Sequence, residues 1–338
     1  MLALPPASRP PRAGITGGQE TARAAHRTPK TGEAADQKLV RIVRTRADHV
    51  PLGIAYMMGA TATFAISQAL SKWLVAGYSF TEVLLFRAAG SLAICALMIL
   101  PHAGLAVFRT HRLGAHITRN GAQAIAQSFL MIALGLMPLA GAIAINFSAP
   151  LFAALAAAIW LHEHISRARA VALLTGFLGV LLVASPGTSS FNVGAIFAIV
   201  NAVMFGSITA AVRGMSSTES AETLTTYQMV CLTVYFTAIA PFFGFTMPNK
   251  LDAAILIGNG LFNGIGQYWW TRALSLAPPA AVGPFYYFSL VWAMIIGFFV
   301  WGDVPTLTLI AGSAIVVASG LYLLWHESTR RAQPPAIE

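Results

Sequence analysis

Long apolar stretches separated by short polar connections dominate the chain after residue 50. Ten of them approach the length of about 20 residues that a helix needs to cross about 30 Å of hydrocarbon. They cover residues 51–71, 80–100, 117–137, 140–161, 168–186, 193–213, 223–244, 252–276, 279–301 and 307–325. Backbone inside lipid must satisfy its own hydrogen bonds, so each stretch is predicted to be a membrane-spanning helix. The expected fold class is an all-α integral membrane protein with ten transmembrane helices.

Polar landmarks of the first half return in the second half about 140 residues later. The matched pairs are Gln123 with Asn263, Gln127 with Gln267, and Pro138 with Pro278. Such spacing indicates an internal duplication. Because each copy holds an odd number of spans, five, the second copy must enter the membrane from the opposite side, as an inverted repeat. The predicted division is a tail at 1–48, repeats at 49–187 and 188–327, and a tail at 328–338.

The composition supports a membrane protein. Apolar residues make up 57% of the chain and charged residues 10%, against about 45–50% and about 25% in soluble domains. Nine of the 21 basic residues precede residue 50, so the net charge belongs to a tail and some loops and does not indicate nucleic-acid binding. The tail is expected to be disordered. It has no apolar core of a secretory signal, and a transit peptide is the alternative interpretation.

The positions of Lys and Arg predict the orientation. With the tail in the cytoplasm, the cytoplasmic connections carry most of the basic residues: Arg109, Arg112, Arg119, Arg167, Arg169, Arg213, Arg330 and Arg331. The opposite connections offer Lys72 and Lys250. We therefore expect a multi-pass protein of a bacterial inner membrane with both termini in the cytoplasm.

Several segments carry a family resemblance, among them FAISQALSKWLVAGYSF, LMPLAGAIAINFSAPLF and YYFSLVWAMIIGFFVWGDVPT. Over residues 51–325 the sequence resembles the drug/metabolite transporter superfamily, as a pair of EamA domains. Phe86-Arg87 and Pro138-Leu139 resemble the group that includes riboflavin and S-adenosylmethionine carriers. The second copy departs from the first at Gln228, which stands opposite Arg87, and at Asp303, where Glu is more usual. The resemblance implies a secondary transporter whose first, third, fourth, sixth, eighth and ninth spans line a cavity.

Amide side chains inside the spans are the main candidates for substrate contacts. Gln123 and Gln127 are four residues apart and share a helix face, as do Asn263 and Gln267. An amide in hydrocarbon needs a partner, so each pair faces the bundle interior, either lining a wet cavity or holding helices together. The nominated substrate contacts are Gln123, Gln127, Asn146, Asn263, Gln267 and Tyr286, with Phe64 and Phe205 as apolar walls.

Arg87 is the charge that is hardest to place. A charged side chain near the bilayer centre costs about 2.5–3.5 kcal/mol on insertion scales. We nominate Arg87 as a group that binds a substrate anion; the alternatives are a structural pair, with Glu82 as the candidate partner, or a side chain that reaches the membrane surface. Tyr286 has an alternative role as well, a hydroxyl bonded to neighbouring backbone.

Small and cyclic residues predict local features. Gly260 and Gly264 have the spacing that lets two helices approach closely. Pro150 is expected to kink the fourth span because it has no N–H for the preceding turn. Trp269 and Trp270 are either interfacial anchors or stacking walls.

No catalytic chemistry is predicted. His162, Glu163 and His164 resemble a metal cluster, but their place at the end of a span favours a solvated cap, and no second ligand cluster accompanies them. No Walker motif or nucleophile elbow is present. We expect no metal, no cofactor and no nucleic-acid partner. The expected partners are a small-molecule substrate and the lipid bilayer, and a homodimer is left open.

The predicted function is alternating-access transport of a small polar organic metabolite, such as an amino acid, a vitamin or a nucleoside-like compound. A membrane channel and an intramembrane enzyme are the alternatives.

Overall fold

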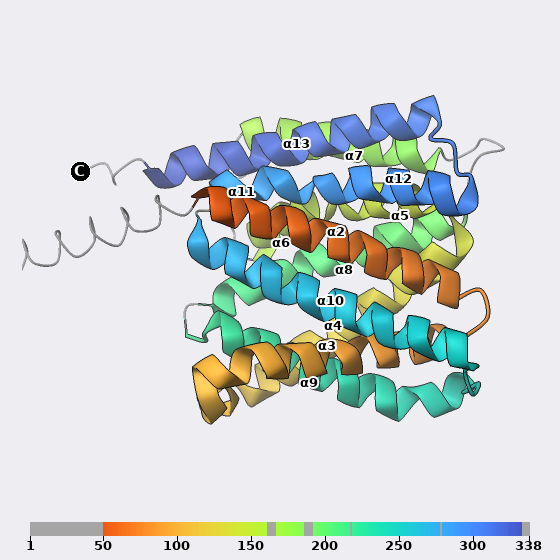
Figure 1. The fold of residues 1–338 in the computed structure, drawn as a ribbon. Helices are drawn as coiled ribbons and strands as arrows, with labels where there is room; N and C mark the ends of the chain where they lie inside the picture. The colour runs from red at the N-terminus through yellow and green to blue at the C-terminus, as the bar shows by residue number, and fades with distance from the viewer. Residues whose placement is uncertain (1–49, 161–166, 186–191, 217, 278, 333–338) are drawn as a thin grey trace, which may run out of the picture. The chain divides into compact units, whose positions relative to one another are not determined.

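The structure, a computed structural model, describes residues 50–160, 167–185, 192–216, 218–277 and 279–332. These residues form helices and turns, with no strand among them (Figure 1). The first half contains α2 (Val50–Leu74), α3 (Phe80–Ala103), η1 (Gly104–Phe108), α4 (Leu113–Leu136), α5 (Leu139–Asn146), α6 (Ala149–Trp160) and α7 (Arg167–Ala184). The second half contains α8 (Gly194–Met215), α9 (Ala221–Ile239), η2 (Ala240–Phe243), α10 (Lys250–Leu276), α11 (Pro279–Tyr286), α12 (Phe288–Trp301) and α13 (Leu307–Ala332).

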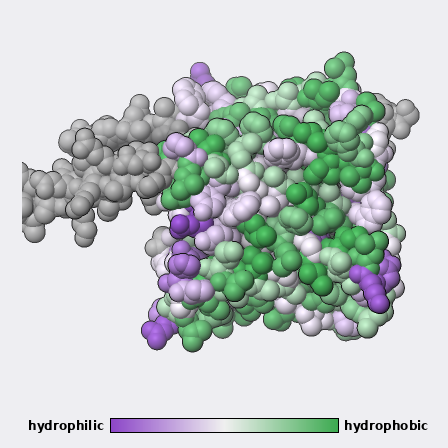
Figure 2. Space-filling view, in the orientation of Figure 1, coloured by the Kyte–Doolittle hydropathy of each residue, from purple (hydrophilic) through white to green (hydrophobic). Residues whose placement is uncertain are grey.

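Each predicted span coincides with a helix or with two consecutive helices. Six helical segments are long and apolar enough to cross a membrane, and Ala170–Ala184 and Leu307–Leu323 are shorter apolar helices. Apolar side chains cover the visible face between two ends where polar side chains gather (Figure 2). Large apolar side chains far from the core are exposed, for example Leu97 at 68% and Phe299 at 78%. The described chain is therefore an all-α, multi-pass integral membrane protein.

The two halves run in opposite directions. The end of the bundle where the described chain begins at Val50 and stops at Ala332 is the terminal end, and the opposite end is the loop end (Figure 1). At the loop end, Lys72 in the last turn of α2 bonds the carbonyl oxygen of Met137. There too, Asn192, just before α8, bonds the carbonyl oxygen of Leu136. Helix α2 thus ends where its counterpart α8 begins, which confirms the inverted repeat.

Three sequence predictions concern residues outside the described part of the chain. They are the tail at 1–48, the cluster of His162, Glu163 and His164, and the boundary between the repeats at residues 187 and 188. Each stays a prediction.

Glycines let α3 and α10 touch through their backbones. A Cβ added at Gly260 would lie 2.7 Å from the carbonyl oxygen of Phe86 and 2.8 Å from the Cα of Gly90. A Cβ at Gly264 would lie 2.7 Å from the Cβ of Ile94. The close approach predicted from the spacing of Gly260 and Gly264 is therefore confirmed.

Lys72 closes the C-terminus of α4 at the loop end. Its ammonium group donates to the carbonyl oxygens of Leu134 (3.0 Å) and Met137 (2.7 Å) and lies 5.4 Å from the ring centre of Trp301. The last carbonyls of a helix have no partner within the helix and carry partial negative charge. The lysine satisfies them and ties α2 to the turn between α4 and α5.

Polar contacts also join α3 and α10 at the loop end. The Tyr78 hydroxyl, in the turn before α3, donates to Asp252 Oδ2 in the first turn of α10 at 2.7 Å. This hydrogen bond raises the pKa of Tyr78, because ionising the phenol would place two negative charges together. Asn249 caps the same helix by accepting from the Asp252 amide at 2.9 Å.

Candidate functional site

Two interrupted helices meet inside the bundle. The fourth span breaks between α5 and α6 at Phe147 and Ser148, and the ninth breaks between α11 and α12 at Tyr287. The Phe147 ring lies 5.2 Å from that of Tyr286 and 4.9 Å from that of Tyr287, centre to centre, so the breaks face each other. Broken spans at the interface of inverted repeats form the substrate sites of many secondary transporters.

A proline lies close to each break, and Pro150 accounts for the first. Pro150 is the second residue of α6, and Pro284 lies near the end of α11. Neither residue has an N–H to donate to the preceding turn, so the helical ladder loses a bond at each position. The interruption expected from Pro150 is confirmed, and the equivalent one beside Pro284 is a second instance that the sequence analysis did not name.

An aromatic wall extends from the breaks to α2 and α10. The Trp270 ring, on α10, lies 4.7 Å from the Tyr286 ring at an interplanar angle of 72°. Phe64, on α2, lies 6.5 Å from Trp270. Together with Phe147, these side chains form a continuous chain of ring contacts that joins four segments of the chain. Edge-to-face pairs of this kind are favourable beyond their buried area.

Three glutamines, one each on α2, α4 and α10, have side-chain amides without a described hydrogen bond. Gln127 and Gln267 are half-buried, and no described residue hydrogen-bonds their side chains. Gln68, on α2 one turn after Phe64, has a buried Oε1 without a described partner. A buried amide without a partner costs free energy, so it needs water or a ligand to satisfy it. The sequence analysis did not select Gln68; its spacing of four from Phe64 was the available signal.

Asn146 and Gln123 differ in their surroundings. Asn146, the last residue of α5, accepts a hydrogen bond at 2.7 Å from Asn201 of α8, which joins the fourth and sixth spans. Asn201 is itself buried and was not selected from the sequence. Gln123 is buried on α4, and no hydrogen bond joins its side chain to the described residues.

Asn263 and Arg87 bond each other. Asn263 Oδ1 accepts from Arg87 Nε at 3.1 Å and from Nη2 at 2.9 Å, and its Nδ2 donates to Ser91 Oγ at 2.8 Å. These bonds hold α3 against α10 next to the Gly90–Gly260 contact. Arg87 Nη1 is buried and has no described partner, which leaves one donor for a ligand or a water molecule.

The alternative pairing of Arg87 with Glu82 does not form among the described residues. Glu82 Oε2 accepts from the backbone amide of Thr246 at 3.2 Å, in the connection after η2. The five-residue spacing rotates Glu82 away from Arg87 on the helix. Asn263, which is distant in sequence, is the hydrogen-bond partner of Arg87 instead.

Phe205 lies apart from the aromatic wall. Its side chain is 37% exposed on α8, and no ring contact joins it to another described aromatic residue. The structure therefore brings Phe64 and Tyr286 together through Trp270, and it leaves Phe205 out of this group.

The sequence matches a known family model twice. The model, described as the EamA-like transporter family, matches residues 51–185 and 192–325. The chain belongs to the EamA-like transporter family. The double match agrees with the two inverted halves of the bundle and with the resemblance stated from the sequence.

Named relatives cover most of the chain. It is 27% identical over 284 residues to a riboflavin transporter of Rhizobium johnstonii, which covers 84% of this chain and 94% of that protein. It is 24% identical over 275 residues to an S-adenosylmethionine uptake transporter of Rickettsia prowazekii, with 81% and 93% covered. A crystal structure with 18% sequence identity superposes with a TM-score of 0.56 over 83% of this chain and 99% of the other. Together with the family, these relatives indicate a transporter of small metabolites, without enzymatic activity.

Proposed function

We propose that this EamA-family protein carries a metabolite with a flat heteroaromatic ring and a polar chain across the bacterial inner membrane by alternating access. The observation that carries the proposal is the meeting of two interrupted helices beside an aromatic wall, with unpaired amides of Gln68 and Gln267 on the same helices as Phe64 and Trp270. Riboflavin and S-adenosylmethionine, which name the relatives' substrates, both combine a flat ring with a polar chain. Ring faces at Trp270 and Tyr286 suit the ring, and glutamine amides suit the polar chain.

The residues assigned to the substrate divide by role. Phe64, Trp270 and Tyr286 form the stacking surface, and Gln68, Gln127 and Gln267 bond the polar groups. Of the remaining nominated residues, we propose that Gln123 and the free Nη1 of Arg87 reach the ligand through water, and that Asn146 and Asn263 hold the helices around it. Phe205 has no role in this proposal.

Counterflow in proteoliposomes tests the proposal. Vesicles loaded with riboflavin should take up labelled riboflavin faster than empty vesicles, and uptake should saturate. A channel would give flux that neither saturates nor responds to riboflavin on the opposite side. The absence of flux for riboflavin, S-adenosylmethionine and a panel of nucleosides would contradict the assigned substrate class.

Gln127→Ala and Gln267→Ala are expected to lower the kcat/KM of counterflow about two- to tenfold each, the loss of one neutral hydrogen bond. Their melting temperatures should stay within a degree or two of wild type, because no described residue bonds these amides. Asn263→Ala is the matched control. It should lower the melting temperature, because it removes the bonds to Arg87. Unchanged kinetics together with reduced stability in the glutamine variants would instead assign them to helix packing.

We expect the terminal end to face the cytoplasm. In a background with Cys95 and Cys231 replaced by Ala, single cysteines can be placed at Val304, 73% exposed at the loop end, and at Leu105, 76% exposed at the terminal end. A membrane-impermeant maleimide added to intact spheroplasts should label Val304→Cys and should reach Leu105→Cys after permeabilisation. The opposite pattern would reverse the orientation, and equal labelling of both would contradict the assignment of these positions to opposite faces.

A further inference from the structure

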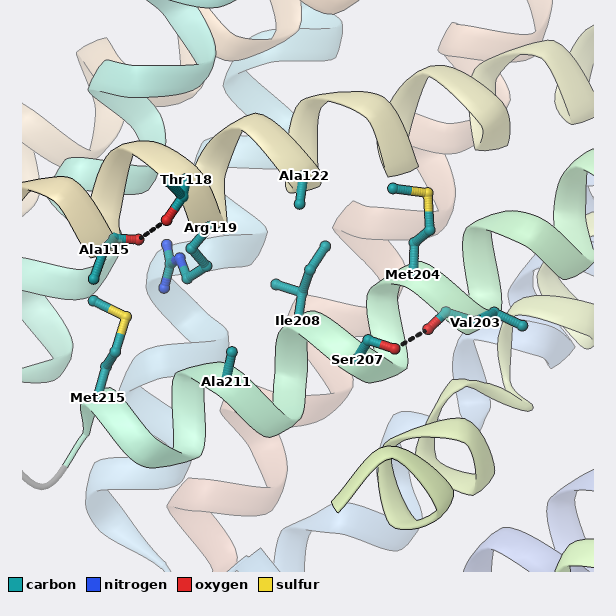
Figure 3. Close-up of a pocket in the computed structure, with 10 residues that line it drawn as sticks. All are labelled: Ala115, Thr118, Arg119, Ala122, Val203, Met204, Ser207, Ile208, Ala211 and Met215. Carbon is teal, nitrogen blue, oxygen red and sulfur yellow. Dashed lines mark hydrogen bonds between the residues drawn. The ribbon is translucent and has the colours of Figure 1, made fainter. Parts of the chain in front are cut away.

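A cavity of about 470 Å³ lies between α4 and α8, toward the terminal end of the bundle (Figure 3). Helix α4 contributes Ala115, Arg119 and Ala122 to its lining, and α8 contributes Ile208 and Met215. Neither the aromatic wall nor the unpaired glutamines line it. It is therefore a different site from the one proposed for the transported metabolite.

Arg119 is the charged side chain of this cavity. Its side chain belongs to α4 and lines the space between the two helices (Figure 3). Nε and Nη2 donate to Asn120 Oδ1 at 3.1 and 2.6 Å. Nη2 also approaches two oxygens of α9, the carbonyl oxygen of Leu224 at 3.4 Å and Gln228 Oε1 at 3.5 Å. All of these acceptors are neutral, and no described carboxylate forms an ion pair with Arg119. Nη1 has no described partner.

The neighbouring carboxylate does not neutralise this charge. Glu219, in the connection before α9, accepts from the Thr110 hydroxyl at 2.6 Å and lies 4.0 Å from His116 Nε2. His116 is buried one turn before Arg119 and stacks on Tyr227 with ring centres 4.4 Å apart. A buried guanidinium without a counter-ion is costly, so the site favours an anion.

The rest of the lining gives the anion an apolar body. The hydroxyls of Thr118 and Ser207 bond the carbonyl oxygens of Gly114 and Val203 within their own helices, at 3.0 and 2.9 Å. The remaining lining residues are alanine, valine, methionine and isoleucine. The cavity therefore offers one cationic group beside an apolar surface.

The equivalent place in the other half is closed. At the offset of 140 residues, Arg119 corresponds to Asn259 of α10, which is buried. Asn259 accepts from Ser67 Oγ at 2.6 Å and donates to Ser71 Oγ at 3.0 Å, both on α2. The α2–α10 pair is joined by side chains where the α4–α8 pair carries an arginine and a cavity. A feature required for the bundle alone would recur in both copies.

We propose that the α4–α8 cavity binds a phosphate ester with an apolar body, the phosphate on Arg119 and the body against α8. Guanidinium groups bind phosphate oxygens through charge-assisted hydrogen bonds, which are about twice as strong as neutral ones. A phospholipid from the adjoining leaflet and a soluble phosphorylated compound share this chemistry. The two sources are separated by the experiment.

Ligand binding to the full-length protein in a neutral detergent tests the site directly, without a transport assay. The probes are dioleoylphosphatidylglycerol against dioleoylphosphatidylcholine, and 1-naphthyl phosphate against 1-naphthol, each titrated by thermal shift. We expect at least one anionic probe to bind wild type at least tenfold more tightly than its partner without net charge. Preference for the phosphatidylglycerol alone assigns the site to lipid, and preference for naphthyl phosphate assigns it to a soluble compound. Equal binding within both pairs overturns the proposal.

Variants locate the binding. Arg119→Gln should weaken the anionic probe about tenfold, while Arg119→Lys should keep part of the preference. Arg112→Gln is the matched control, since Arg112 is exposed one residue before the same helix begins. Equal loss in Arg112→Gln and Arg119→Gln would show general charge attraction and overturn the site.

A second variant leaves Arg119 and its bonds to α9 in place. Ala211→Phe should fill the cavity from α8 and weaken the anionic probe to a similar degree. Binding at wild-type strength in Ala211→Phe would overturn the proposal even if Arg119→Gln failed to fold.

Discussion

Gly260→Ala is expected to destabilise the protein, whereas Gly258→Ala, two residues earlier on α10, is expected to leave its stability unchanged or raise it. The added methyl at Gly260 would lie 2.7 Å from the carbonyl oxygen of Phe86 and 2.8 Å from the Cα of Gly90. These are backbone atoms of α3, so the two helices would have to separate. Overpacking of this kind costs about 1–3 kcal/mol.

The control at Gly258 isolates this cause. A Cβ there meets Leu70 Cδ1 at 4.0 Å, an ordinary contact. Alanine is favoured over glycine inside a helix by about 0.5–1 kcal/mol, so this helix preference alone should make the Gly258→Ala protein slightly more stable. Melting temperatures in detergent, with gel filtration to check monodispersity, measure both variants. If Gly260→Ala melts at or above the temperature of Gly258→Ala, the α3–α10 contact is not as close as described.

Trp270→Ala is expected to raise the KM of counterflow about five- to hundredfold for a substrate with a flat ring. Stacking of a base on an aromatic side chain contributes about 1–3 kcal/mol, which corresponds to this range. Trp270 also orients Tyr286, with ring centres 4.7 Å apart, so its loss removes two walls of the site. Trp270→Phe should retain a large part of the affinity.

Trp73→Ala is the control for this variant, because Trp73 is 53% exposed near the end of α2, away from the wall. Its KM should match wild type. A wild-type KM in Trp270→Ala, combined with a lower melting temperature, would assign Trp270 to packing and move the substrate site elsewhere.

The spans were predictable because their signal is local. Membrane length and apolar composition can be read from consecutive residues, and the helices begin and end within a few residues of the expected ranges. Among the helices that extend beyond the expected ranges are α4, which begins at Leu113 rather than 117, and α13, which continues to Ala332 rather than 325. Both extensions carry polar residues, so a search for apolar stretches excludes them although the helix continues beyond the hydrocarbon.

Side-chain partners were less predictable, because they join residues far apart in the chain. Arg87 is bonded by Asn263, 176 residues away, and the nearby Glu82 turns elsewhere. A helical wheel limits which face a residue occupies, and it does not specify which helix packs against that face. Trp270 was ambiguous for the same reason: its role depends on the neighbours α2 and α11, which the sequence does not place.

The amide pairs show what a repeat can and cannot predict. Matching positions in two copies indicated that Gln123, Gln127, Asn263 and Gln267 face the interior. The structure divides them, because Asn263 is held by Arg87 while Gln127 and Gln267 have no described partner. Corresponding positions share depth and direction, but their neighbours changed when the copies diverged.

Under the proposed alternating-access mechanism, that divergence has a kinetic consequence. Arg87 and Arg119, the arginines that are buried in the described part of the chain, belong to the first copy, and each bonds a helix of the second. Gln228 and Asn259 stand at the matching places. In a carrier whose halves exchange roles, such unequal charges make the two resting forms differ in energy, so the empty protein accumulates in one of them. Half-saturation and maximal velocity should then differ between the two faces of the membrane. For an uncoupled carrier, the ratio of maximal velocity to half-saturation concentration must be the same in both directions, because a catalyst cannot shift the equilibrium distribution of its solute.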